Sequence, residues 1–139
     1  MKPFVWAVLT ALIWGCVPIF EKLGLDKLPV WVGIFYRCLG VILGALVLFA
    51  FKFQEIKDAL ASAPVNILLV FIGGFLASFV GQVCFYFALK NGEASRVVPV
   101  AATYPLISFF LGIIFLSEKV TLAKVGGIFF VLLGIFFLK

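Results

Sequence analysis

Long apolar runs alternate with short polar stretches along the whole chain. The runs cover residues 3–20, 29–51, 64–89, 97–116 and 122–138. Each is close to the ~17–25 residues that a helix needs to cross a bilayer. They are continuously apolar and lack the alternation of a membrane strand. The pattern predicts an all-α membrane protein with five transmembrane helices, organised as one domain over 1–139.

The connections between the runs are short, and none can hold a soluble catalytic domain. The longest joins the second and third runs across residues 52–63. Within it Phe53, Ile56 and Leu60 recur at i, i+3 and i+7, among polar residues. This spacing is typical of a short helix that lies in the membrane interface.

The composition agrees with a multi-pass membrane protein and excludes several classes of function. Hydrophobic residues make up 65% of the chain and charged residues 12%, against ~45–50% and ~25% in soluble domains. The chain has no His and only three widely spaced Cys, so no metal-ligand spacing occurs. No nucleophile–base pair or phosphate-binding loop is present, and the positive charges are scattered. We expect no enzyme activity, metal site, cofactor or nucleic-acid partner.

Arg37 is the one charge clearly inside an apolar run. Placing an arginine there costs on the order of 3 kcal/mol or more. The carboxylates of Glu21 and Glu118 are predicted at the ends of spans, and Glu21 is a candidate partner because both it and Arg37 approach the same membrane side. We group Glu21, Lys22 and Arg37 as a candidate charged gate or clip. Arg37 could instead favour anionic or amphoteric substrates, or its guanidinium could reach the interface along its stem.

Polar side chains inside the spans suggest a cavity between helices. Ser78, Gln82 and Tyr86 are spaced i, i+4 and i+8 and share one helix face. The candidate cavity residues are Trp14, Ser78, Gln82, Tyr86, Thr103, Tyr104 and Ser108. Hydrogen-bonding groups avoid lipid, so these faces should look inward. The alternative is simple hydrogen bonding between helices.

Prolines and glycines mark further candidate positions within the spans. Pro18 and Pro105 lie inside predicted helices and favour kinks, which could serve gating or only reflect membrane-helix composition. The candidate packing glycines are Gly40, Gly44, Gly126, Gly127 and Gly134. Small residues of this kind allow close helix approach. The contact could be between subunits or within one protomer.

The charge distribution gives almost no preference for one orientation. With five spans, one side carries Lys2, Lys52, Lys57, Lys119 and Lys124. The other carries Lys22, Lys27, Lys90, Arg96 and Lys139. A five-to-five balance lacks the bias that normally sets orientation. The chain could insert both ways up and pair as inverted copies, or finer details could fix one orientation.

Several motifs, taken in order, resemble the EamA domain of the drug/metabolite transporter superfamily. Trp14-Gly15 followed by Lys22 resembles its opening, and Arg37 falls where the family has an arginine in its second helix. The remaining matches are Ala88-Leu89 with Glu93-Ala94-Ser95, then Pro105, Ser117-Glu118-Lys119, Gly126 and Gly134. Cys16, Val17 and Pro18 depart from the small and polar residues common after Trp-Gly.

The resemblance implies a small-molecule transporter that works by alternating access, with metabolites, amino acids or drug-like compounds as substrates. Most such transporters have two inverted repeats in ten helices, and this chain matches one repeat. It implies a homodimer, antiparallel if the copies insert both ways up, surrounded by lipid in a prokaryotic cell (inner) membrane. The alternative is a non-transporting subunit, or a half-transporter that needs a different EamA chain.

Overall fold

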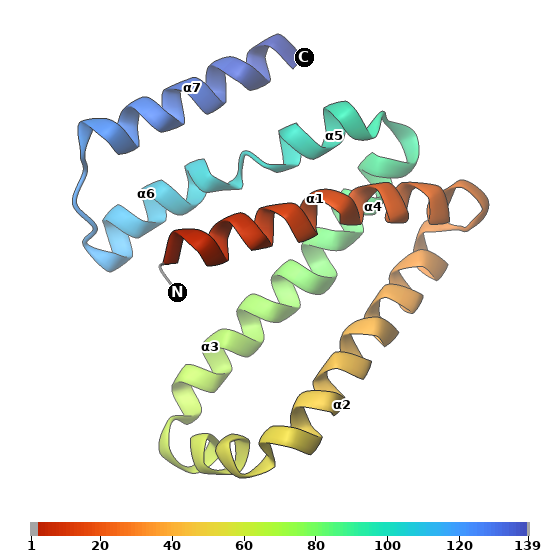
Figure 1. Cartoon of the computed structure of the whole chain (residues 1–139), viewed down its shortest axis with the longest axis vertical. Coiled ribbons are helices and arrows are strands. Elements are labelled where there is room, and N and C mark those ends of the chain that lie inside the picture. Colours follow the sequence, from red (N-terminus) through yellow and green to blue (C-terminus); the bar gives the residue numbers. More distant parts are fainter. Residues whose placement is uncertain (1–2, 139) are drawn as a thin grey trace. The chain divides into compact units, whose positions relative to one another are not determined.

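The computed structural model describes residues 3–138, and all regular structure within them is helical (Figure 1). The chain divides into two units, the first ending at Lys90 and the second beginning at Asn91. The first holds α1 (Pro3–Lys27), α2 (Val30–Ser62), α3 (Pro64–Phe75), the π-helical turn η1 (Leu76–Val80) and α4 (Gly81–Asn91). The second holds α5 (Ala94–Ala101), α6 (Tyr104–Leu116) and α7 (Leu122–Leu138). The all-α prediction is confirmed.

Four helical stretches of the described residues are long and apolar enough to cross a membrane. These are Pro3–Lys27, Val30–Ser62, Pro64–Asn91 and Ala94–Leu116. The last predicted run coincides with α7, which is a shorter apolar helix. The first four predicted runs each lie within one of the four long stretches, apart from Pro29, which precedes α2. Four of the five predicted spans thus have the length and composition of a membrane-crossing helix, and α7, with 17 residues, is shorter.

Helix α1 continues past residue 20, where the first apolar run stops. Its last turns, through Lys27, contain Leu25, which is one of the most completely buried side chains described. Burial of this leucine against other helices stabilises the extra turns of α1, although polar residues surround it in the sequence. Glu21 therefore lies inside a helix, six residues before its end, and not at the end of a span as the sequence suggested.

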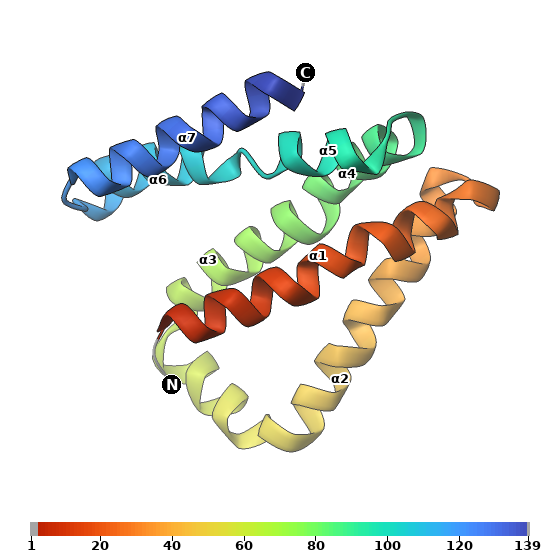
Figure 2. The ribbon, with the colours of Figure 1, turned by 45° about the horizontal axis from the view of Figure 1, so that its top comes forward.

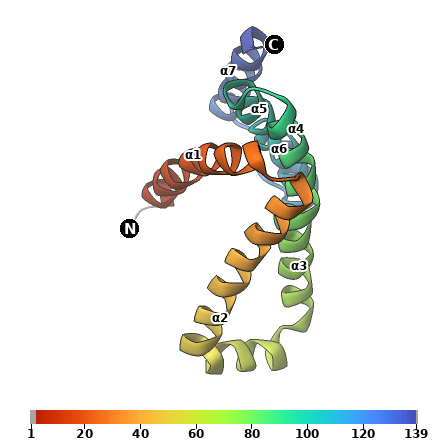
Figure 3. The same cartoon turned by 90° about the vertical axis from the view of Figure 1, so that its right-hand side faces the viewer.

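Helix α2 changes direction at Lys52. This residue has φ −124° and ψ 21°, outside the helical region, in the middle of an otherwise helical segment. Figure 3 shows the chain turning there, so that the last part of α2 runs across toward α3. Residues predicted as a connection with a short interfacial helix are thus helical as far as Ser62.

The first unit packs tightly only at one end. Apart from Pro18, farther back in α1, its buried apolar side chains are Leu25, Val30, Ile34, Tyr86 and Leu89. They come from the end of α1, the start of α2 and the end of α4. Gly33 permits this approach, because a Cβ there would lie 2.8 Å from Leu25 Cδ2 and 3.3 Å from a Tyr86 ring carbon.

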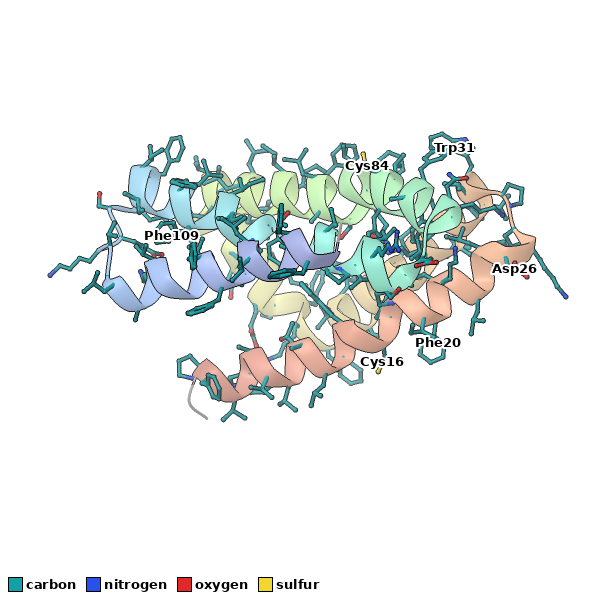
Figure 4. The ribbon with its side chains drawn as sticks, turned by 90° about the horizontal axis from the view of Figure 1, so that it is seen from above. Cys16, Phe20, Asp26, Trp31, Cys84 and Phe109 are labelled. Atoms are coloured by element: carbon teal, nitrogen blue, oxygen red, sulfur yellow. The ribbon has the colours of Figure 1, made fainter. Side chains whose placement is uncertain are left out.

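Away from this packed end, α2 and α3 diverge (Figure 2). Every residue of α2 from 39 to 62 is exposed, and so is every residue of α3. The outward face of α1 behaves similarly, with Cys16 and Phe20 pointing away from the helices (Figure 4). Up to Phe51 the exposed surface of α2 is apolar, and that of α3 is nearly so, as expected of helices that face lipid or other helices in a membrane.

The second unit contains a break in the fourth predicted span. Helix α5 ends at Ala101 and α6 starts at Tyr104, so the chain leaves the helix at Ala102 and Thr103. Pro105 explains this position, because its ring conflicts with the carbonyl four residues earlier and it lacks an amide donor. By contrast, α1 continues as a helix through Pro18.

Helix α6 ends in a turn that uses a strained serine. Ser117 has φ 52°, in the left-handed region, and is the one non-glycine residue with positive φ in the described part of the chain. The amide N–H of Glu118 donates to the Gly112 carbonyl at 3.1 Å. The Ser117 amide donates to the same carbonyl, so both bonds close the end of α6 around a residue in the left-handed conformation, a position at which glycine is preferred.

We expect Ser117→Gly to raise the free energy of unfolding by about 0.5–1 kcal/mol, because glycine adopts positive φ without the steric cost that a side chain imposes. Thermal unfolding in detergent measures the change. Ser95→Gly is the matched control: Ser95 lies inside α5, where glycine should lower stability. A loss of stability in both variants would contradict the assigned turn.

Candidate functional site

Glu21 is the centre of a polar cluster in the first unit. Its Oε1 atom lies 3.4 Å from Arg37 Nε. The same oxygen accepts hydrogen bonds from Gln82 Nε2 and the Tyr86 hydroxyl, each at 3.0 Å. The Glu21 side chain is only 10% exposed and that of Arg37 is 27% exposed. The Glu21 carboxylate thus pairs with the Arg37 guanidinium of α2 and accepts hydrogen bonds from two neutral donors of α4.

The position of the cluster follows from the short connection between α1 and α2. Glu21 lies six residues before the end of α1, and Arg37 lies seven residues after the start of α2. At 1.5 Å per residue both are about 10 Å from the connection, which places them at the same depth. Gln82 and Tyr86 are four residues apart on α4 and therefore lie on one face of that helix.

Arg37 has a second partner in the irregular turn η1. Its Nη1 donates to the Ser78 carbonyl oxygen at 2.8 Å. In η1 the Gly81 amide donates to the Leu76 carbonyl, five residues back, and not to Ala77 as in an α-helix. Such wide turns shift the regular bonding of nearby carbonyls and frequently occur at functional sites. The carboxylate and this carbonyl together compensate the cost of a guanidinium in an apolar span.

Two lysines form a reciprocal cap beside the cluster. Lys22 Nζ, from α1, donates to the Leu89 carbonyl of α4 at 2.6 Å. Lys90 Nζ, from α4, donates to the Leu28 carbonyl just after α1 at 2.8 Å. Both amines satisfy carbonyls at helix C-terminal ends, where a positive charge is stabilising. Lys22 therefore ties α1 to α4, whereas Glu21 ties α1 to α2 and α4.

The structure brings together only part of the predicted cavity set. Gln82 and Tyr86 join the Glu21 cluster, but Ser78 contributes its backbone carbonyl. Trp14 is 63% exposed on α1. Tyr104 is likewise exposed on α6 of the second unit.

The other two predicted cavity residues also lie in the second unit. Thr103 is at the break between α5 and α6, where its hydroxyl donates to the Val100 carbonyl at 2.8 Å. Ser108 is exposed on α6.

The five predicted packing glycines make no close contact inside their own units. A Cβ built on any of them would have nothing from the same unit within 4 Å; they are Gly40, Gly44, Gly126, Gly127 and Gly134. Gly33, which the sequence analysis did not single out, is the glycine that closes the packing in the first unit.

Comparison with known proteins gives the family. The profile of the EamA-like transporter family matches residues 1–139. The chain belongs to the EamA-like transporter family. The sequence resemblance is thereby confirmed, and with it the expectation that this is a membrane transport family and not one of enzymes. No solved structure matches the chain.

Relatives of this EamA-like chain fall into two length classes. An uncharacterised protein of Methanocaldococcus jannaschii is 34% identical over 95% of this chain and 92% of its own length. An uncharacterised transporter of Archaeoglobus fulgidus is 29% identical over 96% of this chain but only 45% of its own length. An uncharacterised transporter of Clostridium kluyveri, 22% identical, is covered over 41% of its length. The chain thus spans less than half of the longer relatives.

Proposed function

We propose that this EamA-like chain is one half of a small-molecule transporter, and that two copies form the complete ten-helix unit. The observation that carries the proposal is the difference in length among relatives. Two of the transporters are slightly more than twice as long as this chain, whereas the Methanocaldococcus jannaschii protein matches it over nearly its whole length. A half-length chain reaches the longer architecture by pairing. Helix α7 then serves as the fifth span of each copy.

The exposed surfaces of the first unit support such pairing. Gly40 and Gly44 lie on α2 with no side chain of their unit against them, and α2 is exposed on all sides from residue 39 onward. A small-x-x-x-small face lets two membrane helices approach closely. We assign Gly40 and Gly44, with Gly126, Gly127 and Gly134 of α7, to contacts between the copies.

We propose that the two copies are antiparallel. The balance of five positive charges on each side removes the bias that would fix one orientation. Two of those ten charges, Lys2 and Lys139, lie outside the described residues. An antiparallel pair reproduces the inverted repeats that build alternating-access transporters in one chain.

In this arrangement the Glu21 cluster and the lysine cap act as a gate on one side of each copy. They hold the ends of α1 and α4 and the start of α2 together. Antiparallel pairing places one such gate toward each membrane surface. Arg37 is then a structural clip, because its guanidinium is engaged by Glu21 and the Ser78 carbonyl.

The substrate cavity is proposed to extend inward from this gate, with Gln82 and Tyr86 at its mouth. We assign to its wall Trp14, Ser78, Gln82, Tyr86, Thr103, Tyr104 and Ser108. Flexing at the chain break before Pro105, and at Pro18, would accompany opening. The relatives come from archaea and bacteria, which supports a prokaryotic cell (inner) membrane as the location.

Transport by the chain alone is the test of the proposal. Purified protein in vesicles should accumulate at least one compound from a panel of radiolabelled amino acids, organic cations and organic anions. Gly40→Ile with Gly44→Ile should shift the protein from dimer to monomer in detergent and reduce uptake at least tenfold. Ile42→Leu, about 200° around the helix from Gly40, is the matched control and should change neither.

The two components of the proposal can fail separately. An intact dimer without uptake of any compound would favour a half-transporter that needs a different EamA chain, or a non-transporting subunit. Uptake by a protein that stays monomeric would contradict the assembly and leave transport in place.

A further inference from the structure

Helix α2 is longer than a helix needs to be to cross a membrane. The helix has 33 residues, or about 50 Å at 1.5 Å per residue. The hydrocarbon core is only about 30 Å thick, and about 40–45 Å with the headgroup regions. The stretch from Val30 to Phe51 is 22 residues, about 33 Å, and fits the core with slight tilt. The helical break falls at the next residue, Lys52.

The segment after the break is amphipathic. At 100° per residue, Phe53, Ile56 and Leu60 fall within an arc of about 60°. Gln54, Asp58, Ser62 and Glu55 occupy the opposite arc. Lys57 borders the apolar face, where its stem can lie on apolar groups while the amine reaches water. The three apolar side chains are exposed, and the first unit does not cover them.

The helices that the segment connects show what covers its apolar face. The segment joins α2 to α3, and both are candidate membrane spans, so it lies at one membrane surface. Its ten residues, 53–62, reach about 15 Å, which is too short to cross the core. Counted together with the hinge residue Lys52, its charges cancel: Lys52 and Lys57 are matched by Glu55 and Asp58, and Lys52 pairs with Glu55. A neutral amphipathic helix at this place fits the boundary between headgroups and acyl chains, without need of anionic lipid.

We propose that residues 53–62 form an interfacial helix that lies in the plane of the bilayer, with Phe53, Ile56 and Leu60 buried among the upper acyl chains. Lys52 is the hinge between the spanning and the interfacial parts of α2. The helix fixes the depth at which the α2–α3 connection sits. This proposal rests on membrane insertion and is independent of dimerisation and transport.

A nitroxide scan through residues 53–62 tests the proposal. Single cysteines are introduced after replacement of Cys16, Cys38 and Cys84 by alanine, and the protein is placed in pure phosphatidylcholine vesicles. Accessibility to oxygen should peak at 53, 56 and 60, and accessibility to a water-soluble nickel complex should peak at 54, 55 and 58. A label at Leu43, within the span, should show high oxygen and low nickel accessibility throughout.

Other outcomes would overturn the proposal. High nickel accessibility at every position would place the segment in water, and high oxygen accessibility at every position would make it part of the span. Low accessibility to both reagents at 53, 56 and 60 would mean that protein, such as a second copy, covers this face. If the cysteine-free background does not fold, amide relaxation by a soluble gadolinium chelate in the unsubstituted chain measures the same oscillation, and its absence would equally refute the interfacial helix.

Discussion

Glu21→Ala is expected to lower the free energy of unfolding by about 2–3 kcal/mol, one of the largest single-residue effects in the chain. The substitution leaves Arg37 without its carboxylate and removes the acceptor of Gln82 and Tyr86. Breaking a buried ion pair costs about 3–5 kcal/mol, and the partial exposure of Arg37 reduces that figure. Denaturant unfolding in mixed micelles measures the loss.

Glu21→Gln separates the charge from the hydrogen bonds. The amide oxygen can still accept from the Tyr86 hydroxyl, but the Coulombic partner of Arg37 is lost. We expect about half the effect of alanine. Because the two residues interact directly, Arg37→Ala combined with Glu21→Ala should cost less than the sum of the single changes by about 1–3 kcal/mol.

An exposed ion pair provides the matched control. Glu55 pairs with Lys52 at three residues' spacing, and both side chains are largely exposed. Glu55→Ala should cost less than about 0.5 kcal/mol. Equal losses from Glu21→Ala and Glu55→Ala would show that the Glu21 cluster does not hold the three helices together.

The pairing of Glu21 with Arg37 could be predicted from the sequence, because both residues lie close to the short connection between the first two spans. A charge inside an apolar run demands a partner, and Glu21 is the nearest acidic residue at a similar depth. The helical periodicity likewise placed Gln82 and Tyr86 on one face. These features depend on spacing along single helices and on one short connection, which sequence patterns record directly.

The contact of Arg37 with the Ser78 carbonyl could not be predicted from the sequence, because it depends on backbone geometry and not on spacing along a regular helix. A π-helical turn arises from a shift of backbone hydrogen bonds, and the residues Leu76–Val80 carry no side chain that signals it. The reciprocal cap of Lys22 and Lys90 depends on two helix ends meeting in space. The length of α1 was underestimated because Leu25 is buried by tertiary packing that the polar neighbours around it conceal.

A reporter fused after residue 139 is expected to mark both membrane sides in the same cell population. The physical reason is the balance of positive charge, with five residues on each side of the predicted topology. Paired reporters, one active only in the cytoplasm and one only outside it, measure the two orientations. Signal from one reporter alone would contradict antiparallel assembly and favour a parallel pair.

Charge-shifted variants make this prediction sharper. Lys57→Gln with Lys119→Gln leaves three positive charges on the first side against five, and should fix the C-terminus in the cytoplasm. Lys27→Gln with Lys139→Gln does the reverse and should fix it outside. Each variant should be inactive alone, because it supplies only one orientation, and co-expression should restore transport. Full activity of either variant alone would show that the functional unit does not need inverted copies, whereas rescue only on mixing would be difficult to explain by any parallel assembly.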